Sequence, residues 1–140
     1  MFRMVPRQSP SRRILIVDDE PELVRALTLR LSSAGYETLS ASDGLTATEM
    51  AFSCRPDLVL LDIGLPIQDG YQVATTLRAA DRTAHIPIVF LTARTWDLDK
   101  ARRSHPDGYV VKPYRPSELL DMVGRLTGAT WIHDGTRSQP

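Results

Sequence analysis

Disulfide pairs, long apolar runs and an excess of charge of one sign are all missing from this sequence. Its one cysteine, Cys54, cannot form an intrachain disulfide, which fits a reducing compartment such as the cytoplasm. No apolar run has the length of a membrane span, and no apolar segment of a signal peptide follows the N-terminal arginines. Lysine and arginine number 17, as do aspartate and glutamate, which disfavours a general nucleic-acid binder. We therefore expect a cytoplasmic protein that contacts neither membranes nor DNA directly.

The residues that are present suffice for one folded domain. Of the 140 residues, 42% are apolar and 24% are charged, fractions that are typical of a globular protein. Residues 1–12 are rich in proline, serine and arginine, so we expect a disordered basic arm there. Residues 13–127 carry the periodic pattern of the domain, and residues 128–140 form a tail that contains Trp131. Because this tail is too short for an effector domain, we expect a stand-alone domain.

Apolar strands alternate with helical segments along the domain. Four segments are nearly unbroken apolar runs: 14–17, 58–61, 86–91 and 109–111. A fifth segment, 36–41, alternates weakly between apolar and polar residues. Apolar residues at helical spacing follow each of them, near 21–35, 44–54, 73–80, 95–103 and 116–126. Unbroken apolar runs are typical of strands buried on both faces, and the alternation predicts a parallel sheet between helices. We therefore predict an α/β fold, in which ligands bind beyond the carboxyl ends of the strands.

Polar residues follow these apolar runs directly. In chain order they are Asp18, Asp19 and Glu20, then Asp62, then Thr92 with Ala93 behind it, and finally Lys112 with Pro113. Because the strands are predicted to be parallel, their carboxyl ends meet at one edge of the sheet. We expect these side chains to converge there.

A group of carboxylates at one edge repels itself, and a hard divalent cation removes that repulsion. Mg²⁺ takes oxygen ligands and commonly uses one or two carboxylates together with waters and a phosphate. Asp19 and Asp62 are the best candidates for direct ligands, with Asp18 one shell further out. Lys112 supplies a compact positive charge, and the Thr92 hydroxyl can donate to a phosphoryl oxygen. The set therefore predicts a magnesium and phosphate site.

An aspartate in such a site can also act as the acceptor of a phosphoryl group. Carboxylates serve as nucleophiles in group transfer, and phosphoryl transfer mainly requires positioning and neutralisation of charge. Asp62 is the best nucleophile because it follows the central strand, and the small Ala93 leaves room for the transferred group. Each residue alone has an ordinary explanation as a helix cap, turn residue or strand former. Only their joint occurrence on successive strands is specific.

Four stretches of the sequence resemble the receiver domain of two-component response regulators. They are ILIVDDEPELVRAL, PDLVLLDIGLPIQDG, IPIVFLTA and GYVVKPY, and the resemblance covers roughly residues 13–127. It implies a flavodoxin-like, doubly wound sheet of five parallel strands in the order 2-1-3-4-5.

The resemblance assigns a role to each candidate residue. Asp62 is implied as the phosphoacceptor, and Mg²⁺ is implied to bind Asp18, Asp19, Asp62 and the backbone carbonyl of Gly64. Thr92 and Lys112 are implied to bind the phosphoryl group beside Ala93, and Tyr109 to turn inward on activation. The bond between Lys112 and Pro113 is implied to be cis.

The resemblance also implies partners. The donor would be the phosphohistidine of a sensor histidine kinase or of a histidine phosphotransfer protein. The output would be a downstream protein that binds the face of the fourth helix, fifth strand and fifth helix, and a homodimer is left open. We expect a switch rather than an enzyme that acts on a separate substrate.

Some residues depart from the usual family pattern. Only 20 positions separate Thr92 from Lys112, and residues 104–107 read Ser-His-Pro-Asp, so we expect a short fourth helix. Arg115 stands where a serine or threonine cap is common, which predicts a weaker start of the last helix. Gly64 and Arg94 lie where the family tunes the lifetime of the phosphate.

Other classes fit the sequence less well. The acidic residues after the first strand would repel the phosphate of a flavin cofactor. A phosphohydrolase of the haloacid dehalogenase type would need a second aspartate where Gly64 stands. An interaction module that keeps the fold without phosphorylation, and a receiver cut from a larger hybrid protein, stay open as alternatives.

Overall fold

The computed structural model of the protein describes residues 11–92, 97–128, 132–133 and 136–137. The elements within these ranges are β1 (Arg13–Val17), α1 (Pro21–Ser33), β2 (Glu37–Ala41), α2 (Gly44–Cys54), β3 (Leu58–Asp62), α3 (Gly70–Ala79), β4 (Ile88–Thr92), α4 (Leu98–Ser104), β5 (Gly108–Val111), α5 (Pro116–Thr127), β6 (Ile132–His133) and β7 (Thr136–Arg137). None of the helices among these residues has the length and apolar character needed to cross a bilayer.

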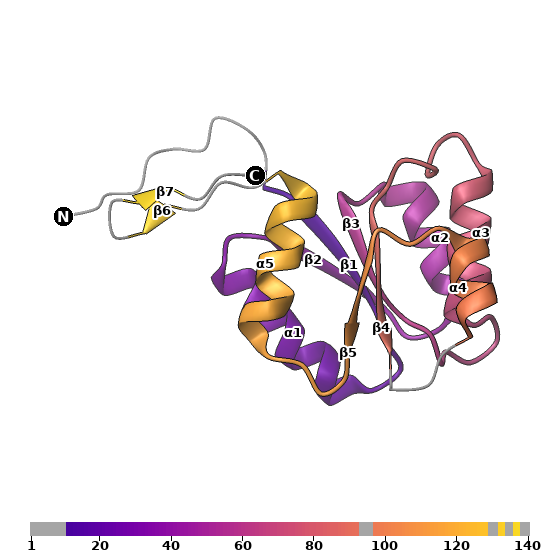
Figure 1. The fold of residues 1–140 in the computed structure, drawn as a ribbon, viewed down its shortest axis with the longest axis horizontal. Coiled ribbons are helices and arrows are strands. Elements are labelled where there is room, and N and C mark those ends of the chain that lie inside the picture. Colours follow the sequence, from indigo (N-terminus) through magenta and orange to yellow (C-terminus); the bar gives the residue numbers. More distant parts are fainter. Residues whose placement is uncertain (1–10, 93–96, 129–131, 134–135, 138–140) are drawn as a thin grey trace.

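The first five strands form one parallel sheet in the order β2-β1-β3-β4-β5. Figure 1 shows α1 and α5 on one face of this sheet and α2, α3 and α4 on the other. The predicted doubly wound α/β fold with strand order 2-1-3-4-5 is therefore confirmed. The order reverses between β1 and β3, which is where ligands bind in sheets of this kind.

The apolar runs build a core on both faces of the sheet. Alternate residues of one strand point to opposite sides, so Leu15 and Val17 belong to the cluster under α2 and α3. Ile14 and Ile16 belong to the cluster under α1 and α5. All four side chains are fully buried, which explains why the strand shows no polar alternation.

Three helices, α2, α3 and α4, begin at aspartate caps. Asp43 accepts the Thr46 N–H at the start of α2, and Asp69 forms a reciprocal capping box with Gln72 at the start of α3. At the start of α5 Arg115 makes no side-chain capping bond, which agrees with the basis of the predicted weaker start. The aspartate caps stabilise the first turns of their helices.

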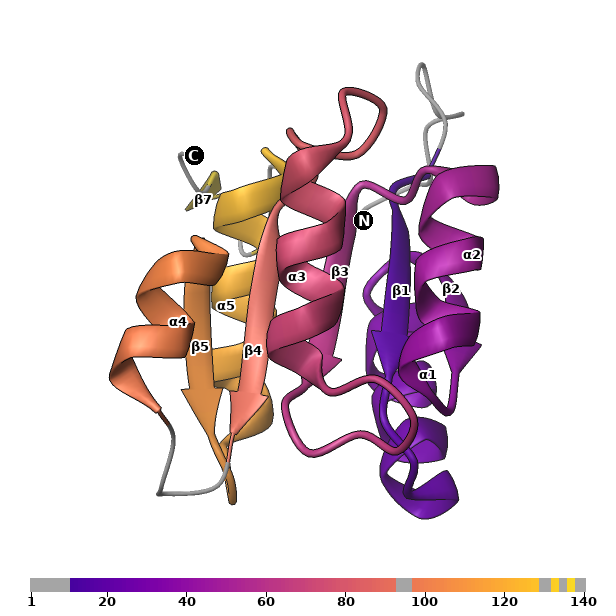
Figure 2. The same cartoon turned by 90° about the vertical axis from the view of Figure 1, so that its right-hand side faces the viewer.

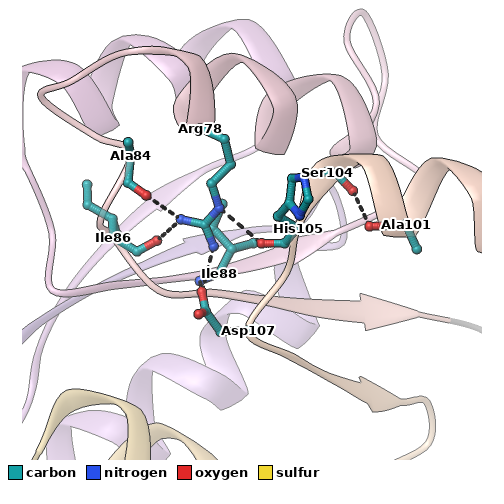
Figure 3. A network of polar contacts seen from close by, with 8 residues as sticks. All are labelled: Arg78, Ala84, Ile86, Ile88, Ala101, Ser104, His105 and Asp107. Atoms are coloured by element: carbon teal, nitrogen blue, oxygen red, sulfur yellow. Dashed lines mark hydrogen bonds and ion pairs between the residues drawn. The ribbon is translucent and has the colours of Figure 1, made fainter.

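A clamp around Arg78 joins the far end of α3 to the segments that flank β4 and β5. Its guanidinium donates to the carbonyls of Ala84, Ile86 and His105 at 2.7–3.0 Å (Figure 3). It also pairs with Asp107 at 2.6 Å. The clamp holds the carboxyl end of α4, whose seven residues confirm the predicted short helix.

The C-terminal tail is more regular than predicted. Residues 132–133 pair with 136–137 as two short antiparallel strands, where the sequence predicted no strand. Short segments of this length carry too few residues for a detectable alternation of apolar and polar side chains. Trp131, most of the basic arm and the predicted start of the fourth helix at residue 95 lie outside the described residues.

Candidate active site at the carboxyl ends of the strands

Three strands bring charged side chains together at one edge of the sheet. Asp18 follows β1, Asp62 ends β3 and Lys112 follows β5. The Lys112 ammonium lies 3.1 Å from Asp18 Oδ2 and 3.5 Å from Asp62 Oδ1. Figure 2 shows the carboxyl ends of the strands reaching the same edge of the molecule. The convergence expected from parallel strands is therefore present.

Asp18 is the most deeply placed of these charges. Its side chain is fully buried, and its two oxygens have different partners. Oδ1 accepts the Glu20 backbone N–H at 2.9 Å, while Oδ2 accepts from Lys112. A buried carboxylate needs such partners because its unpaired charge would be costly. Asp18 therefore holds Lys112 in position.

Three carboxylates lie close enough to share one cation. Asp18, Asp19 and Asp62 each offer an oxygen, and these oxygens lie within 4.8 Å of one another. Asp19 is exposed and Asp62 is partly buried, so the group opens toward solvent on one side. Oxygen donors with an open side match the preference of Mg²⁺, which keeps several waters when bound. The residues present therefore fit a magnesium ion.

Gly64 lies two residues after Asp62, in the exposed loop between β3 and α3. A Cβ placed on Gly64 would meet no atom within 4 Å, so this stretch of backbone borders open space. The Gly64 backbone also forms a hydrogen bond that lowers the pKa of Asp62. The loop thus brings main-chain groups to the same side of the site as the carboxylates.

The surroundings of the site raise the pKa values of both Asp62 and Lys112. Burial raises the pKa of Asp62, and the Asp18 charge raises it further, against the opposing effect of Lys112. Burial acts to lower the pKa of Lys112, but Asp18 and Asp62 outweigh it, so the net shift is upward. The lysine therefore stays charged, and the site without a metal holds excess negative charge.

Thr92 and Tyr109 occupy different environments. Thr92 is buried at the end of β4, and its carbonyl accepts the Lys112 N–H at 2.7 Å. Tyr109 lies on the neighbouring β5 and is 50% exposed. Ala93 and Arg94, which the sequence places beside the phosphate, lie outside the described residues. Thr92 thus lies at the same edge of the sheet as Lys112, and Tyr109 is half-exposed.

Tyr114 lies at the site although nothing in the sequence indicated it. The peptide bond from Lys112 to Pro113 is cis, as the resemblance implied, and Tyr114 follows it. The Tyr114 hydroxyl is buried without a hydrogen-bond partner among the described residues, and burial, with Asp18, raises its pKa to about 12. The Glu20 carboxylate lies 3.9 Å from the Lys112 ammonium. A tyrosine after a proline does not by itself predict burial near Asp18, because only the path of the folded chain brings the two side chains close.

Comparisons with known proteins agree with this geometry. A family model described as the response regulator receiver domain matches residues 14–124. The DNA-binding dual master transcriptional regulator RpaA of Synechocystis is 39% identical over 120 residues, which cover 84% of this chain and 50% of that protein. The DNA-binding response regulator MtrA of Mycolicibacterium smegmatis is 43% identical over 114 residues, which cover 80% of this chain and 49% of that protein. The chain thus spans about half the length of these curated relatives.

Solved structures of the same shape include two receivers. One is the receiver domain of the sensor histidine kinase PA1611 from Pseudomonas aeruginosa, with a magnesium ion coordinated in its active-site cleft. It superposes with a TM-score of 0.80 at 30% identity and covers 85% of this chain and 99% of that one. The chemotaxis response regulator CheY4 of Vibrio cholerae superposes with a TM-score of 0.77 at 26% identity. The match covers 84% of this chain and 99% of CheY4.

Proposed function

The chain belongs to the response regulator receiver domain family, and from that premise we propose that it is a switch in which Asp62 accepts a phosphoryl group. The observation that carries the proposal is the pair of contacts from Lys112 to Asp18 and Asp62, beside the three clustered carboxylates. A lysine held by a buried aspartate remains in place when the charge on its second partner changes. This is what a site that gains and loses a phosphate requires.

We propose that Asp19, Asp62 and the carbonyl of Gly64 hold Mg²⁺, with Asp18 one shell out. When bound, the ion neutralises charge on the carboxylates and on the phosphoryl oxygens. The receiver domain of PA1611 carries magnesium in its cleft, which supports the same occupant here. The oxygen donors of this chain support it independently.

In the proposed transfer, an oxygen of Asp62 attacks the phosphorus of a phosphohistidine. The new bond joins that oxygen to phosphorus, while the phosphorus–nitrogen bond breaks and the imidazole leaves with its electron pair. Lys112 is already within reach of Asp62, so it can pair with the phosphoryl oxygens without a large movement. The donor is a sensor histidine kinase or a histidine phosphotransfer protein. The chain itself acts as a switch and not as an enzyme on a separate substrate.

We propose that the switch is read through the face of α4, β5 and α5. The Thr92 hydroxyl donates to the phosphoryl group, and Tyr109 then moves toward the space that Thr92 leaves. The starting state fits this step, because Tyr109 is 50% exposed on β5 beside an exposed Val111. A Thr92→Ala variant should still be phosphorylated but should lose the phosphorylation-dependent change in hydrogen exchange of β5. A variant that changes as the parent does would contradict this role.

The proposed output is a protein contact in the cytoplasm. The DNA binding named for RpaA and MtrA belongs to longer proteins, of which this chain spans about half, and it is not transferred here. The balanced charge of 17 basic and 17 acidic residues supports a protein partner, since DNA binding draws on an excess of basic residues. The single cysteine supports a reducing compartment.

The test is intact mass after incubation with acetyl phosphate, with and without Mg²⁺. We expect one added phosphoryl group that requires Mg²⁺ and is absent from an Asp62→Asn variant. No adduct together with no Mg²⁺ binding would contradict the proposal and favour an interaction module that is never phosphorylated. No adduct with Mg²⁺ still bound would reject the small donor and leave the protein donor as the only route.

A further inference from the structure

Ile67 combines two properties that rarely occur together in one residue. Its backbone is left-handed, with φ at 71°, and its side chain is 79% exposed. Left-handed backbone is unfavourable for a β-branched residue because the Cβ crowds the chain. The Gln68 N–H donates to the Pro66 carbonyl at 2.7 Å, which closes a three-residue γ-turn around Ile67. Strain of this kind persists only where the surrounding structure imposes it, and it clusters at functional sites.

The loop between β3 and α3 is fixed from both sides. The Gly70 N–H donates to the Ile63 carbonyl at 2.9 Å, and a Cβ on Gly70 would come within 2.6 Å of the Asp62 carbonyl oxygen. On the other side, a Cβ on Gly44 of α2 would overlap the carbonyl of Gln68. The backbone segments therefore approach as closely as glycine allows. The turn is imposed by its neighbours, so its tip is presented in one orientation.

The tip of this loop lies beside the site. Ile67 follows Asp62 by five positions, and Figure 2 shows the loop crossing the edge where the strands end. Two other exposed apolar residues border it: Pro66, and Leu45, which follows the Gly44 whose backbone N–H donates to the Pro66 carbonyl at 3.5 Å. We call Leu45, Pro66 and Ile67 the Ile67 patch. It lies on the α2 side of the site, away from the face of α4, β5 and α5.

We propose that the Ile67 patch is a docking contact for the protein that donates the phosphoryl group, an inference that rests on the proposed function. The Asp62 side chain is only 13% exposed, so a donor histidine reaches it only by entering the cleft. The surface around that histidine then covers the rim of the cleft, which includes the loop from Asp62 to Gly70. A protein that binds the face of α4, β5 and α5 does not need to cover this loop. The donor is thus expected to carry an apolar side chain beside its phosphohistidine.

The rigidity of the loop supports this occupant. A contact that is already ordered loses little conformational freedom on binding, so an exposed apolar side chain on it contributes most of its burial to affinity. Pairs of charges around the cleft would be screened by salt, whereas this contact would not be. Ile67 is therefore assigned as a specificity-determining residue for the protein donor and not as part of the chemistry.

The test separates docking from chemistry with two donors. Ile67→Gly and Ile67→Asn both tolerate a left-handed backbone, and Leu29→Ala removes a side chain that is 64% exposed near the far end of α1. A panel of ³²P-labelled histidine kinases is first screened for the kinase that phosphorylates the parent fastest. Each variant is then phosphorylated with acetyl phosphate and, in a separate reaction, with that kinase. We expect acetyl phosphate rates within about twofold of the parent for all three variants. We expect the kinase rate to fall about tenfold for both Ile67 variants, as burial of one apolar side chain predicts, and to be unchanged for Leu29→Ala.

Stability provides an independent readout. Because the left-handed turn is strained for isoleucine, both Ile67 variants should melt at or above the temperature of the parent. Equal kinase rates in the parent and in the Ile67 variants would overturn the inference while leaving the proposed function intact. So would a parent that acetyl phosphate labels but no kinase labels, or a parent dimer that Ile67→Gly disperses without slowing transfer. A parent that acetyl phosphate does not label and that binds no Mg²⁺ would instead refute the proposed function.

Discussion

Replacing Lys112 with methionine tests the electrostatic design of the site. The Lys112 ammonium lies within 4 Å of three carboxylates, those of Asp18, Asp62 and Glu20. Asp18 is fully buried, so it depends on this cation more than the exposed Glu20 does. Methionine keeps the length and the apolar stem of lysine but removes the charge. The substitution therefore isolates the effect of the positive charge.

The expected loss of stability follows from the burial of Asp18. Removing one partner of a buried ion pair costs about 3–5 kcal/mol, and the lower end applies here because Lys112 is 24% exposed. For a chain of this size, about 3 kcal/mol corresponds to a melting temperature lower by roughly 10 °C. Magnesium should act in the opposite direction, because Lys112 competes with the ion for the same carboxylates. We expect the variant to bind Mg²⁺ about tenfold more tightly, which is about 1.4 kcal/mol.

The assay is thermal unfolding in a chelating buffer and again in saturating Mg²⁺. Lys112→Met should lose stability in the chelating buffer and recover more of it than the parent does when Mg²⁺ is added. Lys100→Met is the matched control, since Lys100 is the other lysine of the chain and is exposed over the ring of Tyr71. Its change should be about 0.5–1 kcal/mol or less, with no effect on Mg²⁺ binding. A Lys112→Met variant as stable as the parent without metal, or one that binds Mg²⁺ more weakly, would refute this reasoning.

Three further substitutions test other parts of the structure. Arg78→Met should lower the free energy of unfolding by about 2–4 kcal/mol in denaturant titrations, because three carbonyls, two of them part-buried, lose a charged donor; a loss below about 1 kcal/mol would contradict the clamp. Asp62 has a raised pKa, so the stability of the metal-free parent should fall as pH rises from near 3.8 through the folded pKa. Asp62→Asn should therefore melt above the parent at neutral pH and equal it in acid, and an advantage that persists in acid would count against this. Gly44→Ala should cost about 1–3 kcal/mol, since its Cβ overlaps the Gln68 carbonyl, and a neutral effect would show that the loop can move.

Much of the fold could be predicted because its determinants are local. Each buried strand is a short run of apolar residues, and each is followed by residues at helical spacing, so both the elements and their order along the chain are visible. The position of Asp18, Asp62 and Lys112 at one edge follows from a single rule, that parallel strands end on the same side. The strand order itself came from the family resemblance, because alternation alone does not order the strands.

The rest depends on how loops pass between distant segments. The turn at Ile67 is set by the close approach of Gly44 and Gly70, and neither approach is visible in the neighbouring residues. The same holds for the buried hydroxyl of Tyr114 and for the carbonyls that surround Arg78. At the turn and around Arg78 the neighbouring groups are backbone carbonyls, and the burial of the Tyr114 hydroxyl also depends on the path of the chain, so none of the three is known before the chain has folded.

The most direct test of the central claim is to locate the phosphoryl group. The chain is labelled with acetyl phosphate and Mg²⁺, reduced with sodium borohydride, which converts an aspartyl phosphate to homoserine, and sequenced as peptides by mass spectrometry. The account predicts homoserine at position 62 and at no other aspartate. Homoserine at Asp18 or Asp19, or a labelled chain without homoserine at position 62, would contradict it.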